Sequence, residues 1–169
     1  MATRISVFNS KELQGILVAM KAVEPEVSKQ IRRVTKQVIE PVWKSAVTSR
    51  VRDAFQSKVL GATARVAVSN QNVTLQSARI GRSLSGGIKP SDAMHSAEFG
   101  ADQSKTSTYT ATSSRGKKYQ VTRRTRTQFL PRKKGGYVVY PAVAEVIPRI
   151  ASLWVQTTVR TFYELIEKK

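Results

Sequence analysis

The sequence predicts an α+β protein in which a long, kinked N-terminal helix and a C-terminal helix pack on a small antiparallel sheet, with a protruding basic loop or hairpin. Three observations support this fold class. Apolar residues recur at helical spacing over residues 25–55 and again over 147–166. Short β-prone runs separated by Ser, Asn and Gly lie between these segments. A strongly basic segment precedes the last helix.

Size and composition bound the function. A chain of 169 residues is long enough for one domain with its own core. It has no cysteine, which excludes disulfides, a thiolate nucleophile and a cysteine-type zinc site. With 29 Lys and Arg against 11 Asp and Glu, the net charge is +18. A compact body repels itself at such a charge, so we expect an anionic or acidic partner.

We expect a single domain, 1–169, with five regions along the chain. These are a strand plus helices (1–60), short strands (61–100), a mobile loop (101–118), a basic hairpin (119–140) and the C-terminal helix (141–169). The amino-terminal segment carries polar and charged residues where a secretory signal needs a continuous apolar stretch. We therefore expect a soluble protein that is made in a cytoplasm.

The first region contains a short strand and two helices. Residues 4–8 alternate as in a strand, and Ser10 is a suitable cap for a helix that ends before Pro25. From Pro25 the apolar residues are spaced by three to five, which predicts a helix of about thirty residues. They are Val27, Ile31, Val34, Val38, Val42, Val47, Val51 and Phe55.

Pro41 lies inside this long helix. It removes one backbone hydrogen bond at a cost of about 3 kcal/mol unless the helix kinks, so we expect a bend near Val38, with Trp43 anchoring the far side. The opposite face is basic and is expected to be solvated, the alternative being a contact with acid or phosphate. Its members are Lys29, Arg32, Arg33, Lys36, Lys44 and Arg50.

The middle of the chain predicts small strands at 65–68, 73–75 and 78–80. Residues 83–92 form a loop by composition, and 93–99 form a further strand or one helical turn. The C-terminal stripe of apolar residues predicts a helix after Pro141. Pro148 either starts this helix or kinks a longer one that begins near residue 142.

The charge is concentrated between residues 102 and 140, which carry ten basic and one acidic side chain, or +9 of the +18. Residues 101–117 are rich in Ser and Thr, bury too little to order themselves, and predict a mobile loop. Residues 119–129 alternate as in a strand. A glycine pair at 135–136 then precedes an apolar run at 137–140, which predicts a hairpin with its basic tip at 132–134.

These patterns nominate two sets of functional residues. The basic arm, facing a partner or DNA, comprises Arg123, Arg124, Arg126, Arg132, Lys133 and Lys134. Candidates for a subunit interface are Phe129, Tyr137, Tyr140 and Trp154. The arginines and lysines could neutralise phosphates, with the interleaved aromatic residues as stacking surfaces. The alternative is a basic ribbon that contacts acidic protein.

Catalytic and metal-binding patterns are not found in the sequence. His95 is the only histidine, and the nearby Ser91 and Asp92 are not accompanied by a Gly-x-Ser-x-Gly elbow. No Asp, Glu or His cluster has metal-ligand spacing, and the glycine pairs lack a phosphate-binding framework. We therefore expect a non-enzymatic protein without a metal or cofactor.

The order of parts resembles the tail-completion or neck proteins of long-tailed bacteriophages, over most of residues 4–168. Members carry a "VEFG" or "EFG" turn where this chain has Ala97-Glu98-Phe99-Gly100. They carry a "Pro, apolar, apolar, Pro-Ala" entry to the last helix where this chain has Tyr137-Val138-Val139-Tyr140-Pro141-Ala142. Two features depart from the family pattern. Residues 55–64 lack a Pro-Val-Arg-Thr-Gly stretch, and residues 101–134 are longer and more basic.

The resemblance implies a structural virion protein of the neck, or head–tail connector, that is assembled in the host cytoplasm. It implies a homo-oligomeric ring, of six subunits, around the channel through which DNA leaves the capsid. Other connector and tail proteins are its expected partners, with DNA in the channel as a further candidate and no membrane. The alternatives are a tail terminator, a free-standing nucleic-acid-binding protein that uses the basic hairpin, and an RNA-coated protein of the ribosomal type.

Overall fold

The computed structural model describes residues 2–6, 14–15 and 25–167, and it confirms the α+β class. Two antiparallel sheets are present among these residues. The first contains β1 (Ala2–Ser6), β2 (Arg65–Val68) and β3 (Asn72–Gln76), and the second contains β4 (Thr106–Thr112) and β5 (Lys118–Arg124). The helix predicted between Ser10 and Pro25 lies mostly outside the described residues.

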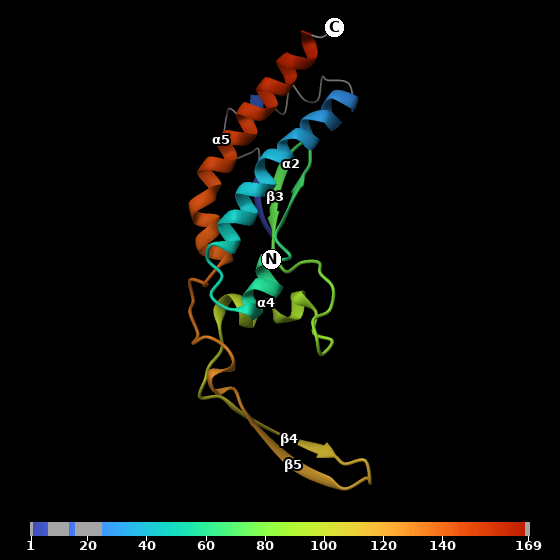
Figure 1. The fold of residues 1–169 in the computed structure, drawn as a ribbon, viewed down its shortest axis with the longest axis vertical. Helices are drawn as coiled ribbons and strands as arrows, with labels where there is room; N and C mark the ends of the chain where they lie inside the picture. Colours follow the sequence, from blue (N-terminus) through green and yellow to red (C-terminus); the bar gives the residue numbers. More distant parts are fainter. Residues whose placement is uncertain (1, 7–13, 16–24, 168–169) are drawn as a thin grey trace.

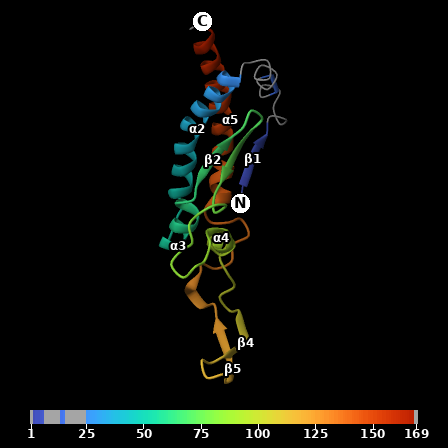
Figure 2. The same cartoon turned by 90° about the vertical axis from the view of Figure 1, so that its right-hand side faces the viewer.

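Two long helices form the main layer of the body. The helical elements are α2 (Pro25–Thr48), α3 (Ala54–Gln56), the π-helical turn η2 (Ser57–Gly61), α4 (Pro90–Phe99), the 3₁₀ turn η3 (Arg126–Gln128) and α5 (Val139–Ile166). Helices α2 and α5 lie side by side, and the three-stranded sheet packs against them (Figures 1 and 2). The β4–β5 hairpin projects from the opposite end of the molecule from the carboxyl terminus.

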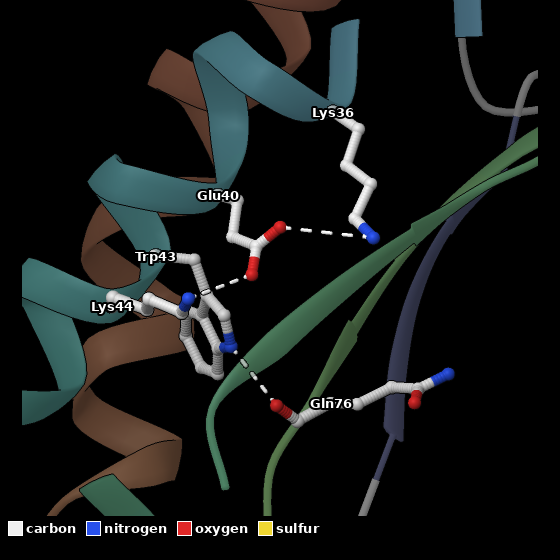
Figure 3. Close-up of polar contacts among 5 residues, drawn as sticks. All are labelled: Lys36, Glu40, Trp43, Lys44 and Gln76. Atoms are coloured by element: carbon white, nitrogen blue, oxygen red, sulfur yellow. Dashed lines mark hydrogen bonds and ion pairs between the residues drawn. The ribbon is translucent and has the colours of Figure 1, made fainter. Parts of the chain in front are cut away.

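Strand β3 is central in the first sheet, whose order is β1-β3-β2. Val66 lies opposite Leu75 in the register, and paired residues of antiparallel strands point to the same face. Both side chains are buried in the core that includes Trp43 of α2. The Trp43 indole N–H donates to the Gln76 carbonyl oxygen at 3.1 Å, which joins helix to sheet (Figure 3).

The buried face of α2 differs from the predicted stripe. Its members are Ser28, Ile31, Thr35, Ile39, Trp43 and Val47, mostly four residues apart. The burial of Trp43 is confirmed, whereas Val38 is 38% exposed. Of the predicted stripe, Ile31 and Val47 are confirmed as buried, whereas the other four predicted residues within α2 each lie one position before a buried residue. The helix ends at Thr48, and a separate helix begins after Asp53, whose carboxylate accepts from the Gln56 N–H at 2.6 Å.

Helix α5 is the longer of the two predicted forms, because Pro148 lies inside it. It begins at Val139, two residues before the predicted region boundary at 141. Its buried side chains recur three or four residues apart, as in one face of a helix. They are Val139, Ala142, Val146, Ile150, Trp154, Thr158 and Thr161.

The predicted boundaries of the basic hairpin are wrong. Residues 101–118, predicted as a loop, contain β4, which pairs with β5. Strand β5 therefore pairs with the strand that precedes it in the chain. Residues 137–140 lead into α5 and do not form a partner strand for β5. The predicted strand region 61–100 also contains a helix, α4, and residues 78–80 form no strand. Strand β2 has the predicted bounds, 65–68.

Candidate functional site

The structure divides the predicted basic arm between two places. The hairpin half comprises Arg123, Arg124 and Arg126, and the loop half comprises Arg132, Lys133 and Lys134. The loop half lies in residues 130–138, which connect the hairpin to α5. Its predicted position at a hairpin tip is wrong, because the turn of the hairpin is 113–117. That turn contains two further cations that the sequence patterns did not single out, Arg115 and Lys117.

The hairpin has two chemically different faces, because paired residues share a face and successive residues alternate. Thr106 lies opposite Arg124 and Thr112 opposite Lys118. The register defines an aromatic face with Ser107, Tyr109, Ala111, Tyr119, Val121 and Arg123. It defines a threonine face with Thr106, Thr108, Thr110, Thr112, Lys118, Gln120, Thr122 and Arg124.

Both faces of the hairpin are exposed. Of its two seven-residue strands, only Ala111 and Val121 are partly covered. Tyr109 is 40% and Tyr119 50% exposed. The hairpin extends beyond α4 and away from the helical body (Figures 1 and 2). A two-stranded hairpin without a packed face is only marginally stable in water, so this segment lacks the support that its own chain gives to the other strands.

The base of the hairpin is anchored to the body. The Arg126 N–H donates to the Gln103 carbonyl oxygen at 3.1 Å. The Gln103 side-chain amide donates to the Phe129 carbonyl oxygen at 2.9 Å. The half-buried Phe129 ring packs on Phe55, with 5.6 Å between centroids. The hairpin is therefore held at its base while its strands remain exposed.

The hairpin carries a large excess of positive charge. Residues 102–126 contain seven basic side chains, all exposed: Lys105, Arg115, Lys117, Lys118, Arg123, Arg124 and Arg126. Within the described part of the chain, none of the seven forms an ion pair. The Arg123 guanidinium lies over the Tyr109 ring, 5.4 Å from its centroid. Such a contact leaves the positive charge unneutralised.

Asp102 is the only carboxylate in this segment. Its Oδ1 accepts hydrogen bonds from the Ser104 hydroxyl at 2.6 Å and from the Ser104 N–H at 3.0 Å. These hydrogen bonds, followed by the charges of Lys105 and Arg132, hold the pKa of Asp102 below its ordinary value of 3.8. The carboxylate is thus engaged at the base of the hairpin and does not neutralise its strands.

The loop half of the basic arm is positioned by a buried carboxylate, Glu98 of α4. The Glu98 side chain, 0% exposed, accepts from the Val139 N–H at 2.8 Å and the Tyr140 N–H at 2.9 Å, and from the Val138 N–H at 3.3 Å. Pro141, the next residue, has no N–H. The first turn of α5 therefore has no unpaired backbone donor, and the negative charge also lies at the positive end of the helix.

Two glycines allow this close approach. Gly100 (φ 69°) lies so close to the loop at 130–138 that a Cβ on it would collide with the carbonyl oxygens of Leu130 and Pro131. A Cβ on Gly136 (φ 70°) would collide with the Glu98 carboxylate. The Lys133 N–H donates to the Phe99 carbonyl oxygen at 2.8 Å. The Glu-Phe-Gly run and the start of the last helix, 40 residues apart, thus form one structural unit.

The side chains of the loop half surround a shallow cationic hollow of about 190 Å³, lined by His95, Phe99, Arg132, Lys133 and Lys134. The His95 ring stacks on Phe99 at 5.1 Å between centroids, and the Lys133 ammonium lies 5.1 Å from the Tyr137 ring centroid. Within the described ranges, no carboxylate lines the hollow. This surface is a second place where an anion could bind, separate from the hairpin strands.

The three interface candidates other than Phe129 have different surroundings. Tyr140 is 44% exposed and packs on Phe99 at 5.3 Å. Tyr137 is half-buried, with the guanidinium of Arg52 over its ring. Trp154 is 1% exposed and belongs to the core of its own chain. The prediction of Trp154 as an interface residue is therefore wrong, because its apolar spacing reflected burial in the body.

The residues considered for catalysis do not form a triad. The Ser91 hydroxyl donates to Asp92 at 3.1 Å, while His95 packs on Phe99. Among the described residues there is no group of three or more His, Cys, Asp or Glu that could hold a metal ion. The helices of the same described residues are all too short or too polar to span a membrane.

Comparisons with protein-family models, with curated proteins and with solved structures found no match to this chain. The sequence patterns missed the structural role of Glu98, and they missed four cations of the hairpin: Lys105 before β4, Arg115 and Lys117 in the turn, and Lys118 in β5. A signal for β4 was present, since Thr recurs at every second position from 106 to 112, which is typical of a strand.

Proposed function

We propose that this chain is a structural virion protein of the phage neck, a component of the head–tail connector that assembles as a ring of six subunits and helps to join or complete the tail. In this proposal the protein performs no catalysis and needs no cofactor. Its partners are further copies of itself and other connector and tail proteins.

The observation that carries the proposal is the projecting hairpin. Two seven-residue strands, exposed on both faces, extend from a body that is otherwise well packed. Such a hairpin gains stability when it meets a surface outside its own chain. In a closed ring every copy presents the same arm in an equivalent position, so the arms of all copies can reach one shared partner, such as a neighbouring connector protein or DNA in the channel.

The unit built around Glu98 adds support. The phage-like Glu-Phe-Gly turn and Pro-Ala helix start contact one another through the Glu98 carboxylate and the Val139 and Tyr140 N–H groups. The resemblance therefore rests on one connected structural unit, since neither motif could form these contacts without the other. In this unit Glu98 accepts the hydrogen bonds, Gly136 leaves room for its carboxylate, and Pro141 has no N–H that needs a partner.

Two measurements test the proposal. Native mass spectrometry of the purified protein is expected to show a closed oligomer, with six subunits as the predicted number. Phage particles assembled without the protein are expected to accumulate as separate heads and tails of normal length. A protein that stays monomeric at high concentration, together with normal particles in its absence, would contradict the proposal. Tails of uncontrolled length would assign the role of tail terminator instead.

A further inference from the structure

We infer that the β4–β5 hairpin binds duplex DNA as a two-stranded ribbon that enters a groove and contacts the phosphates on either side. This inference deepens the proposed function by naming a partner for the hairpin. The DNA contact itself depends only on the hairpin, so it can be tested on the isolated protein whether or not a ring forms.

The positive charge of the hairpin favours a polyanion as its partner. Seven exposed cations and one engaged carboxylate lie within residues 102–126. Clustered cations without acidic partners repel one another, and a polyanion relieves this repulsion. A second copy of the chain could not neutralise these cations with its own carboxylates, because the whole sequence carries only 11 Asp and Glu against 29 Lys and Arg. A second copy is therefore a poor partner for the hairpin cations.

The distribution of the cations favours a groove over a flat surface. Arg123 lies on the aromatic face, whereas Lys118 and Arg124 lie on the threonine face. The turn carries Arg115 and Lys117, and the base of the hairpin carries Lys105 and Arg126. A flat partner or a single nucleic-acid strand would neutralise one face only. In a duplex groove, phosphate backbones flank the ribbon on both sides.

The dimensions of the hairpin agree with this geometry. Seven residues at about 3.4 Å each make a ribbon about 24 Å long. The major groove of B-DNA is about 12 Å wide and admits a two-stranded β-ribbon. On the threonine face, the side chains between the cations are exposed hydroxyls and an amide, including Thr108, Gln120 and Thr122. Such groups commonly contact phosphate and sugar in protein–DNA interfaces.

An acidic protein fits this surface less well. Protein–protein interfaces concentrate apolar and aromatic residues at their centre and are depleted of Lys and Ser. On the hairpin the larger apolar groups are limited to Tyr109, Tyr119 and Val121 on one face, with the cations around them. The threonine face has no large apolar side chain.

The test measures binding of the full-length protein to a labelled duplex of about 20 base pairs and mixed sequence, by fluorescence anisotropy across a series of salt concentrations. Contacts to five to seven phosphates predict a slope of log K against log salt of about −4.5 to −6. The variant Arg115→Ala/Lys117→Ala/Lys118→Ala should weaken binding more than about tenfold at 100 mM salt and reduce the slope by about 2.7.

The matched control is Arg33→Ala/Lys58→Ala/Arg149→Ala, which removes the same charge from exposed positions of the body. It is expected to keep duplex affinity within about threefold of the unchanged protein, because the removed charges lie away from the contact. Circular dichroism of both variants checks that each is folded. Equal losses in the two variants would show a general charge effect and overturn the inference.

Other probes distinguish the remaining partners. A single strand of the same length should bind more weakly than the duplex, and polyglutamate should not displace the duplex at equal charge concentration. Tighter binding of the single strand, displacement by polyglutamate, or no duplex binding at low salt would each overturn the inference. A ring without DNA binding would contradict only this inference, whereas DNA binding by a permanent monomer would contradict only the proposed assembly.

Discussion

The cations of α2 and those of the hairpin are in opposite situations. On α2, Lys29 pairs with Glu26 at 3.4 Å. Figure 3 shows that Glu40 pairs with both Lys36, at 3.8 Å, and Lys44, at 2.8 Å. On the hairpin, none of the seven cations pairs with a carboxylate of the described residues. The expectation of a solvated basic face is consistent with the exposed Lys29, Lys36 and Lys44. It is wrong for the half-buried Arg32, which donates to Asn70, and Arg50, which pairs with Glu145 of α5.

The difference has a simple geometric basis. A helix brings residues three and four apart onto one face, so an acid placed at that spacing neutralises its neighbours. A hairpin places residues of its two strands opposite one another, and here the residues opposite the strand cations are threonines and a serine, not acids. Net charge alone therefore does not identify a binding surface, whereas the absence of nearby acids on an exposed element does.

The largest expected effects concern the packed body. Replacing Trp43 or Trp154 by Ala removes a fully buried side chain and should lower the free energy of unfolding by about 3–5 kcal/mol. Replacing the exposed Tyr119 of the hairpin by Ala should lower it by less than about 1 kcal/mol. Urea denaturation of the three variants checks this. Equal losses in body and hairpin would show that the hairpin belongs to the cooperative core.

The next effect concerns the unit at Glu98. Glu98→Ala should lower the free energy of unfolding by about 3 kcal/mol, because it leaves the first backbone donors of α5 unpaired. Glu98→Gln keeps one carbonyl oxygen as acceptor and should cost less. Gly136→Ala should be destabilising as well, through collision with the carboxylate. In a double-mutant cycle the losses should not add, and additive losses would contradict direct contact between the two residues.

This unit also explains where prediction from sequence stopped. Strand β2 was predictable because Arg65 to Val68 alternate locally. The start of α5 was not, since Val138 and Val139 favour a strand by local propensity and a carboxylate 41 residues earlier determines that a helix begins there. Strand β4 was missed because its threonines bury little, and its order comes from pairing with β5. The place of Arg132, in the loop between the hairpin and α5, could not be predicted without knowing where α5 starts and that β4 pairs with β5.

A smaller effect tests the ion pairs of α2. Glu40→Gln removes the partner of Lys36 and Lys44 and should lower the free energy of unfolding by about 0.2–1 kcal/mol, because the two lysines are about half exposed. Arg124→Ala in the hairpin should change it by less, since no carboxylate of the described residues pairs with Arg124. Thermal melts at low and high salt check the comparison. A larger loss for Arg124→Ala would indicate an intramolecular partner for the hairpin.

The smallest effect concerns Asp102 at the base of the hairpin. Hydrogen bonds from Ser104 lower the pKa of this carboxyl group below its ordinary value of 3.8. A lowered folded-state pKa means that the carboxylate contributes stability above its unfolded pKa, and that this contribution is lost as the pH falls through the folded pKa. A carbon-detected NMR titration should give a midpoint below 3.8, and Ser104→Ala should raise it. A midpoint at or above 3.8 would contradict the hydrogen bonding.

Amide hydrogen exchange of β4 and β5 tests the central claim most directly, namely that the hairpin is completed by a partner outside its own chain. In the isolated monomer, we predict that these amides exchange much faster than those of α5, because few contacts hold the hairpin closed. In the assembled ring or on duplex DNA, the same amides should become protected while the body changes little. Hairpin amides as protected as α5 in the monomer, and unchanged in the complex, would contradict the account.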